Sequence, residues 1–339
     1  MFTGINVNWV GLRKYAYLFS ALLIGAGVVS YFNRGFELGV DFKGGYSYNV
    51  QFDQTVNPDQ IRNSLAVSLE NTPTIVKAID TKNTFNITTP YMIDSNAEDV
   101  DAKVVAKVYE GLKTIVPSLT LEQFMKADAK GTHIVSSTKV GAVVADDIKR
   151  SAFKSMGLAL FLIFLYILVR FNKWQFSLGV VLSLFHDVLC VMAIFSLLHG
   201  FLPFSLEFDQ ALVAALLTIV GYSLNDTVVV FDRIREFMNL YKGKAKKIVI
   251  NDAINNTLNR TVMTSLITFM TMLVLFIFGG SSIKGFTFAL LVGVFFGTYS
   301  SIFIATPIVV DLTKGDENTP FDEAVGKIAP KREEEVAAV

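Results

Sequence analysis

The sequence predicts a polytopic α-helical membrane protein with six transmembrane helices and one α+β domain between helices 1 and 2. Two observations predict this class. Of 339 residues, 52% are hydrophobic and only 18% are charged, whereas soluble domains average roughly 25% charged residues. The charges also avoid six stretches, and a bilayer core needs about 17–25 mostly apolar helical residues. The net charge is zero, which argues against nucleic acid as a partner.

The six apolar stretches are predicted to form the membrane helices in chain order. The shortest lies between Lys154 and Arg170, whose long side chains can reach the interface and extend the span. The first is longer than the apolar part of a signal peptide, so we expect a retained anchor. The stretches cover residues 15–32, 155–169, 174–198, 211–231, 261–278 and 285–310.

Lysine and arginine are distributed unequally between the two sides that these helices define. With the N-terminus inside, one side holds 14 basic residues (Arg13, Lys14, Arg170, Lys173, Arg233, Arg235, Lys242, Lys244, Lys246, Lys247, Lys314, Lys327, Lys331, Arg332). The short loops opposite hold only Lys284. Short basic loops stay cytoplasmic. We therefore expect a cytoplasmic N-terminus and first membrane helix (1–33), an extracytoplasmic domain (34–150), helices 2–6 (151–312) and a cytoplasmic tail (313–339).

Residues 34–150 contain the charges and turn signals of a soluble domain. Strands are predicted at 46–52, 74–79, 84–89 and 132–137, and helices at 57–70 and 97–115. This order, βαββαβ, is ferredoxin-like, a fold that by itself specifies no function. A binding or lever-like role is favoured over catalysis. The glycine-rich segment 38–45 is interpreted as a turn, because it lacks the G-x-x-x-x-G-K-[ST] pattern of a phosphate loop.

Asp226 is the clearest candidate functional residue, because an ionisable side chain inside a membrane helix is costly and needs a purpose. Its natural partner is Arg260, at the edge of the fifth span. Two readings stay open for this pair: a proton carrier, or a static ion pair that fixes helix packing. A stripe of hydroxyl residues continues below Arg260 and either binds helices together or lines a hydrated path. It consists of Thr261, Thr264, Ser265, Thr268 and Thr271.

The third and sixth spans carry three further features. His186-Asp187 lies midway along the third span and is either a proton relay or a satisfied structural pair. The single cysteine, Cys190, can form no internal disulfide and is interpreted as a small packing residue. Gly293 and Gly297 are four residues apart, followed by Ser301, a spacing that favours close helix packing.

The run from Ala211 to Glu236, which contains Gly221-Tyr-Ser-Leu-Asn-Asp226, closely resembles the signature of the SecF family of protein-export membrane subunits. Gly39-Val-Asp-Phe-Lys-Gly-Gly45, Lys139-Val-Gly141, His186-Asp-Val188 and Asn259-Arg-Thr261 with Thr264-Ser265 resemble it as well. The resemblance covers about residues 15–312. Lys43 departs from the small polar residues usual in the glycine-rich turn, and residues 142–147 replace a more polar and basic stretch.

The resemblance implies a proton-coupled subunit of the Sec pathway and no enzyme or cofactor. Its implied partners are SecD, the SecY-SecE-SecG translocon, YajC, membrane lipid and the unfolded exported polypeptide. The implied location is the bacterial inner membrane, with the large domain in the periplasm. In this family the fourth-span carboxylate is linked to proton passage. We therefore predict a relay built from Asp226, Arg260, Thr264, Asn225, Asp187 and His186, and expect no metal site.

Three other functions are alternatives for this chain. The nearest architecture outside the family is half of a resistance-nodulation-division exporter, a proton-coupled transporter. A non-enzymatic scaffold for SecD or the translocon would need Asp226 and Arg260 only for structure. An intramembrane aspartyl protease would need Asp187 and Asp226 to share a proton, but no glycine immediately precedes Asp226.

Overall fold

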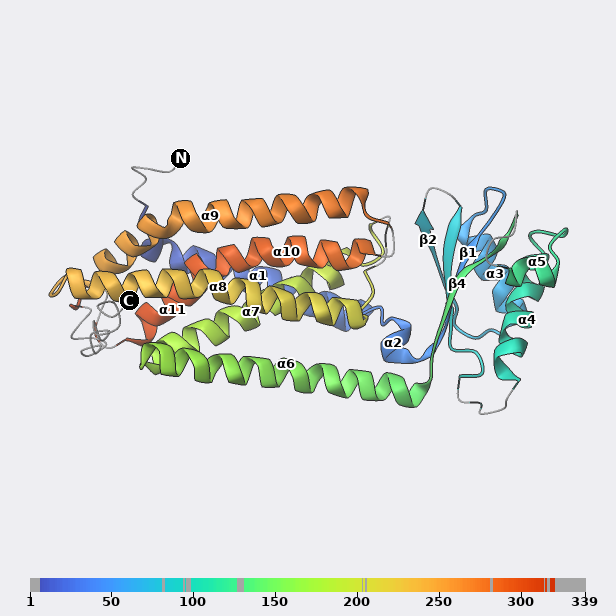
Figure 1. Cartoon of the computed structure of the whole chain (residues 1–339), viewed down its shortest axis with the longest axis horizontal. Helices are drawn as coiled ribbons and strands as arrows, with labels where there is room; N and C mark the ends of the chain where they lie inside the picture. Colours follow the sequence, from blue (N-terminus) through green and yellow to red (C-terminus); the bar gives the residue numbers. More distant parts are fainter. Residues whose placement is uncertain are drawn as a thin grey trace, which may run out of the picture.

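A computed structural model describes residues 7–320, apart from 81–82, 94, 96–98, 127–130, 203, 205, 281–282, 314 and 316–317. Most of the tail expected at 313–339, from residue 321 on, and the start of the helix expected at 97 therefore lie outside the described residues. Figure 1 shows an elongated molecule with long helices at one end and a small sheet with short helices at the other.

Six helices in the described part of the chain are long and apolar enough to cross a membrane, as the sequence predicts. The last combines two α-helices joined by a π-helical turn, η2 (Ser301–Ala305). The other five are continuous. They are α1 (Trp9–Arg34), α6 (Ala142–Phe171), α7 (Trp174–Leu198), α8 (Gln210–Leu240) and α9 (Lys246–Phe278). The interrupted span consists of α10 (Lys284–Ser300), η2 and α11 (Thr306–Leu312).

Several helices extend beyond the apolar stretches that predict them. The span expected at 155–169 belongs to α6, which begins at Ala142 and has 30 residues. The span expected at 261–278 belongs to α9, which begins at Lys246. An apolar stretch in the sequence marks only the part of a helix that contacts lipid or the protein core. The helix itself extends further, as long as its backbone hydrogen bonds continue.

The soluble unit is a four-stranded antiparallel sheet in the order β2-β3-β1-β4, which confirms the ferredoxin-like prediction. Within this unit, the helix that begins at Pro58 is capped by Asn57 through a capping box, and Pro58 lies in its first turn. The elements are α2 (Val40–Lys43), β1 (Gly45–Gln51), α3 (Pro58–Ser68), β2 (Ile75–Asp80), β3 (Thr84–Thr89), α4 (Val100–Lys113), α5 (Leu121–Met125) and β4 (His133–Val140).

The two faces of this sheet differ in chemistry. Val50, Phe85 and Ile87 are buried together with apolar residues of α3 and α4 in a core separate from that of the membrane helices. On the other face, the side-chain amide of Asn86 on β3 donates hydrogen bonds to the side-chain oxygens of Ser47 and Asn49 on β1. Figure 1 places α3, α4 and α5 beyond the sheet, so the sheet lies between these helices and the membrane bundle.

A short linker and a loop hold the soluble unit to the bundle. Leu38, which follows α1, forms a parallel bridge with Phe208 in the loop before α8. Lys77 on β2 makes salt bridges to Glu37 in the linker (2.5 Å) and Glu207 in the loop (2.9 Å). Glu37 also lies 3.1 Å from His199 at the end of α7. These contacts join the sheet, α1 and α7 at one junction.

The segment 38–45, expected to be a turn, contains the single-turn helix α2 between glycines. Gly44 and Gly45 have φ values of 73° and 143°, which L-residues with a side chain rarely adopt. A Cβ on Gly45 would lie 2.8 Å from the carbonyl oxygen of Thr89. The paired glycines therefore let β1 begin directly against β3.

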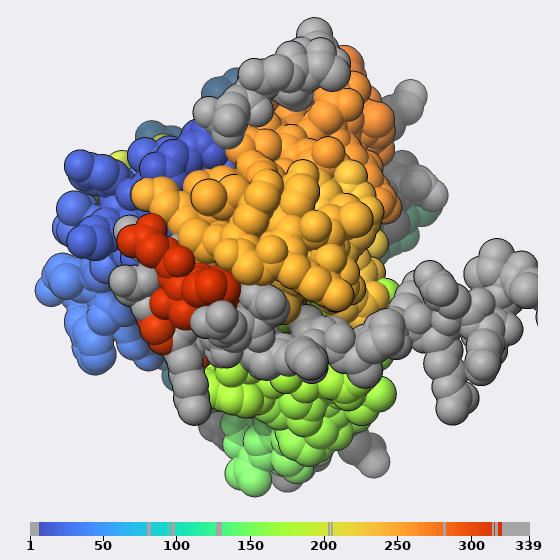
Figure 2. All heavy atoms as spheres, turned by 90° about the vertical axis from the view of Figure 1, so that its left-hand side faces the viewer, coloured from blue at the N-terminus to red at the C-terminus, as the bar shows by residue number. Residues whose placement is uncertain are grey.

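The bundle end away from the sheet is seen face-on in Figure 2, where residues joining α8 to α9 lie beside α11. Lys246 is buried there, and its ammonium group donates to the carbonyl oxygens of Val310, Thr313 and Gly315 at the end of α11. A cation at a helix C-terminus is stabilising. Asp232 pairs with Arg170 (2.8 Å) at the same end. Basic side chains expected on the cytoplasmic side thus gather at one end of the bundle.

Candidate functional site in the membrane bundle

Asp226 lies inside the bundle on α8 and is only 3% exposed. Its Oδ2 accepts a hydrogen bond from the hydroxyl of Ser265 on α9 (3.0 Å). Ser265 in turn accepts from Thr298 on α10 (2.6 Å). Three helices therefore meet at one buried carboxyl group whose direct partner is a neutral hydroxyl.

Arg260 does not form the direct ion pair that the sequence predicts. Among the described residues no salt bridge joins Arg260 to Asp226, and Arg260 is exposed. It lies on α9 five residues before Ser265, which is a little more than one helical turn closer to the bundle end away from the sheet. At that position its long side chain is free to reach water, so Ser265 takes the place that was expected for the cation.

The hydroxyl stripe on α9 is satisfied largely by its own helix. Thr264 donates to the carbonyl oxygens of Arg260 and Thr261, and Thr268 donates to that of Thr264. Thr271 does the same with Ile267. Such back-bonding leaves the hydroxyl oxygens able to accept. Thr264 is exposed and, among the described residues, forms no hydrogen bond with Asp226, whereas Ser265 of the same stripe does.

Asp187 forms the centre of a second polar cluster on α7 and is fully buried. Its Oδ2 accepts from Ser223 on α8 (2.6 Å) and from Ser300 on α10 (2.9 Å). Its Oδ1 lies 3.2 Å from Nδ1 of His186. Because Ser223 and Asp226 are three residues apart on α8, the two clusters lie within about one helical turn of each other.

His186 continues this second cluster toward α1. Its Nε2 lies 2.9 Å from the hydroxyl of Ser20, and Ser20 lies 3.3 Å from the hydroxyl of Tyr299. With the imidazole proton on Nδ1 directed at Asp187, Nε2 accepts the Ser20 hydroxyl. Cys190 is buried beside the ring, with its sulfur 3.4 Å from Nε2. The His186-Asp187 pair is thus fully hydrogen-bonded.

Asn225 is not part of either cluster. It is exposed on α8, and no hydrogen bond of its side chain is found among the described residues. Arg260, Thr264 and Thr271 on α9 are exposed as well, among the exposed apolar side chains of that helix.

Asp187 and Asp226 are held in separate clusters by different hydroxyl groups, and no hydrogen bond joins the two carboxyl groups among the described residues. The shared proton of an aspartyl protease needs two carboxyls in contact. The described residues also contain no group of three or more His, Cys, Asp or Glu side chains that could hold a metal ion.

Five hydroxyl residues belong to these clusters but are uncharged, so the rule that a charge inside an apolar stretch is functional does not single them out. Each is a common interior residue of a membrane helix, and only its pairing with a carboxyl group distinguishes it. A signal is present for Ser223, one turn from Asp226, and for Ser265, in the α9 stripe. The five are Ser20, Ser223, Ser265, Thr298 and Ser300.

Family models match most of the chain. The C-terminal region of the protein export membrane proteins SecD/SecF matches residues 120–315, and the SecD/SecF GG motif matches residues 29–56. The second match contains Gly44 and Gly45, the glycines at the start of β1.

Curated relatives and solved structures are similar over nearly the whole chain. The protein translocase subunit SecF of Rhodothermus marinus is 46% identical over 92% of this chain and 95% of its own length. SecF of Sebaldella termitidis is 35% identical over 95% of the chain and 97% of its own length. The crystal structure of SecDF from Thermus thermophilus, a translocon-associated membrane protein, is 31% identical with a TM-score of 0.74. It matches 91% of this chain, which spans only 39% of that longer chain. Six membrane-crossing helices, a glycine-initiated sheet and these matches together place the chain in the SecD/SecF family of protein translocase subunits, on its SecF side.

Proposed function

We propose that this chain uses the proton gradient to assist the export of unfolded proteins across the bacterial inner membrane, in a complex with SecD. Asp226 is the proton-carrying residue in this proposal. The observation that carries it is the buried Asp226 carboxyl group, whose direct partner is the neutral hydroxyl of Ser265. Burial disfavours the charged form of a carboxyl group, whereas a close ion pair favours it. With a neutral hydroxyl as its direct partner, the Asp226 carboxyl group is not locked in the charged form by a salt bridge.

A route for the proton would use the polar residues on either side of Asp226. Arg260 and Thr264 lie toward the bundle end away from the sheet, and Asn225 lies on the outer side of α8. The Asp187–His186 cluster lies one turn away through Ser223. One charge crossing a potential of 100 mV releases about 2.3 kcal/mol, so a few protons per cycle suffice to bias a movement of the soluble unit.

The topology belongs to the same proposal. We place residues 1–33 as the cytoplasmic N-terminus and first membrane helix, 34–150 in the periplasm, 151–312 as the remaining membrane helices, and 313–339 as a cytoplasmic tail. The support is that basic side chains such as Arg170 and Lys246 gather at the bundle end opposite the sheet, and basic segments stay on the cytoplasmic side.

SecD is the partner for which most support exists. The SecDF protein of Thermus thermophilus is 35% identical to this chain over only 38% of its own length, so its chain has ample length for a SecD part. The exposed side chain of Asn225 on α8 offers a polar contact for such a partner. The SecY-SecE-SecG translocon, YajC and the exported polypeptide are further partners that membership of the family suggests.

The deciding experiment compares Asp226→Asn with wild type in liposomes that also contain SecD. Because the amide can still accept from Ser265, we expect the variant to fold and assemble. Proton flux and gradient-dependent stimulation of export should both be lost. Asp232→Asn is the matched control on the same helix, since Asp232 pairs with Arg170 at the helix end, and it should retain both activities.

The alternatives predict other results in the same assay. A scaffold would stimulate export equally after the gradient is collapsed by an uncoupler. A transporter half of the resistance-nodulation-division type would couple proton flux to a small solute and not to export. Gradient-dependent export that persists in Asp226→Asn would contradict the proposed role of Asp226.

A further inference from the structure

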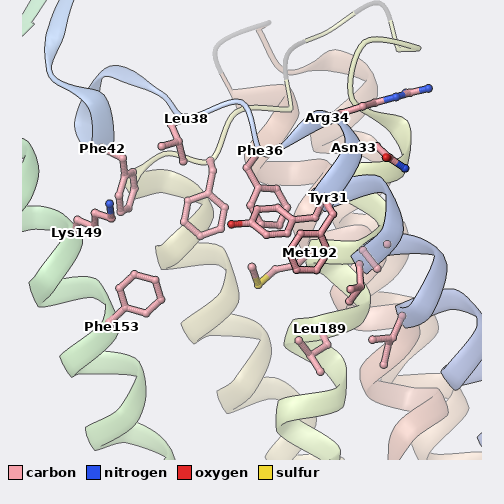
Figure 3. Close-up of a pocket in the computed structure, with 17 residues that line it drawn as sticks. Tyr31, Asn33, Arg34, Phe36, Leu38, Phe42, Lys149, Phe153, Leu189 and Met192 are labelled. Atoms are coloured by element: carbon pink, nitrogen blue, oxygen red, sulfur yellow. The ribbon is translucent and has the colours of Figure 1, made fainter.

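A cavity of about 900 Å³ opens between α1, α6 and α7 at the bundle end next to the soluble unit (Figure 3). We call it the α1–α6 cavity. Small-molecule sites in proteins usually enclose about 300–1,000 Å³, so its size fits a substantial ligand. Its described walls include neither Asp187 nor Asp226, so it is separate from the candidate proton site.

The cavity faces the hydrocarbon of the bilayer. The helices on its two sides are among the least covered in the bundle, with only 17% of the apolar window of α1 and 6% of that of α6 buried. The corresponding shares are 61% for α7 and 67% for the span made of α10, η2 and α11. A membrane molecule can therefore enter sideways between α1 and α6 while α7 forms the back wall.

The lining combines an apolar chamber with positive charge and no carboxylate. Tyr31, Phe153 and Met192 lie around the chamber in Figure 3, and Lys149 lies at its rim beside Phe42. No aspartate or glutamate is among the lining residues. Arg34 also belongs to the lining, but its guanidinium group stacks on the ring of Phe201 (4.9 Å). Lys149 is exposed and has no salt-bridge partner among the described residues, so its ammonium group is available to an anionic ligand.

The depth of the cavity identifies the kind of membrane molecule. The lining residues of α1 run from Ile24 to Arg34, which is about 15 Å at 1.5 Å per residue. This is half of a hydrocarbon core of about 30 Å, the length of one leaflet. A partner helix that crosses the membrane would need a groove along the whole bundle, whereas α6 contributes only Lys149 and Phe153, one turn apart.

We propose that the α1–α6 cavity binds one phospholipid from the leaflet next to the soluble unit, with its phosphate on Lys149 and an acyl chain beside Tyr31, Phe153 and Met192. The bound lipid also touches the junction of the two parts of the molecule. Phe42 and Phe208 line the cavity, with their ring centroids 5.3 Å apart. Phe208 belongs to the loop that holds the linker after α1. Lipid occupancy would therefore stiffen the attachment of the soluble unit.

The test uses the full chain in vesicles of phosphatidylethanolamine that contain a phosphatidylglycerol probe with a photoactivatable diazirine in its acyl chain. After illumination, mass spectrometry locates the adducts. We expect them on the peptides that contain Phe153, Leu189 and Met192, in excess over the exposed residues of α9. Leu189→Trp and, separately, Met192→Trp fill the cavity and should remove these adducts.

Lys149→Glu tests the phosphate contact without filling the cavity. It should lower the adduct yield at the lining peptides by roughly fivefold or more, which corresponds to about 1 kcal/mol per basic residue near an anionic lipid surface. Two matched controls lie on α6 but outside the lining: Lys154→Glu and Leu162→Trp, the latter at a side chain that is 55% exposed. Both should leave the yield unchanged.

Two results would overturn the proposal. In the first, the adducts are spread evenly over the exposed helix surfaces and are insensitive to Leu189→Trp, Met192→Trp and Lys149→Glu, as for ordinary surrounding lipid. In the second, the lining adducts disappear when SecD is included in the vesicles, while adducts on the rest of α6 remain, which would make a partner helix the occupant. Either result leaves the proton assay of Asp226→Asn unaffected, so the two proposals fail separately.

Discussion

Asp209 caps the start of α8, where its carboxylate accepts from the backbone N–H of Leu212 (2.7 Å). The pKa of this carboxyl is raised to about 6, mainly by burial; the hydrogen bond from Leu212 opposes the rise, and the negative charges of Glu207 and Asp41 contribute to it. The folded protein therefore holds this proton more tightly than the unfolded chain does. As the pH rises from about 4 to about 6, the folded state loses stability at this residue.

Replacing Asp209 by Asn should remove this pH dependence. The amide oxygen retains the helix cap without a charge to desolvate. In detergent at pH 7.5, we expect Asp209→Asn to be more stable than wild type by about 1–2 kcal/mol, and its thermal midpoint to be higher accordingly. Near pH 4 the two midpoints should be equal. The measurement is a thermal melt at several pH values. A midpoint that depends on pH as strongly as that of wild type would contradict the assignment.

The charged residues of the candidate site are predictable from the sequence, but their partners are not. Asp226 and Asp187 are conspicuous because a carboxylate in an apolar run is expensive. Opposite charge suggested Arg260 as the partner of Asp226, yet the structure gives that contact to Ser265. A helix turns by about 100° per residue, so residues five apart face different directions, and only the packing of α8, α9 and α10 decides which one meets Asp226.

At the scale of elements, α8 and α10 approach closely because α10 presents glycines to α8. A Cβ on Gly297 would lie 3.0 Å from Cβ of Ser223, and one on Gly293 would lie 2.1 Å from Cδ1 of Ile219. This confirms the packing role expected from their spacing. Since Ser223 donates to Asp187, the same close approach also completes the hydrogen bonds of the buried carboxyl group.

Gly297→Ala should therefore destabilise the bundle, although alanine is the better helix former. Pushing Ser223 away overpacks the interface and weakens its bond to Asp187, at a cost of about 1–3 kcal/mol. Gly157→Ala on α6 is the matched control, because nothing lies within 4 Å of a Cβ there, and it should be neutral or stabilising by up to about 1 kcal/mol. Thermal melts in one detergent compare the two, and equal midpoints would exclude a role of close packing.

At the scale of the whole molecule, the soluble unit is attached through a small group of largely buried charges. Lys77, with a side chain 19% exposed, lies between Glu37 and Glu207, which are 11% and 23% exposed. Ion pairs that lose much of their water are sensitive to the removal of one partner, because the remaining charge is left uncompensated. The single lysine on β2 therefore controls how firmly the sheet is held to the bundle.

Lys77→Glu should loosen this junction without unfolding either part, because each part has its own apolar core. The backbone N–H of Phe208, which donates to the carbonyl oxygen of Glu37 (2.7 Å), should exchange with deuterium at least tenfold faster, the effect of losing about 1.4 kcal/mol of local stability. Lys103→Glu is the control, since Lys103 forms an exposed pair within α4. Unchanged exchange at Phe208 would show that the backbone contacts alone hold the junction.

The sequence by itself determined the six membrane helices, the order of strands and helices in the soluble unit, and the two carboxyl groups inside the bundle. These depend on local patterns: apolar runs, alternation along strands, turn residues and charges in costly places. Only the tertiary structure decided that Ser265 and not Arg260 contacts Asp226, that Lys77 joins the sheet to the bundle, and that a cavity separates α1 from α6. These contacts depend on the rotation of each helix about its axis and on residues distant in the chain, which no local pattern specifies.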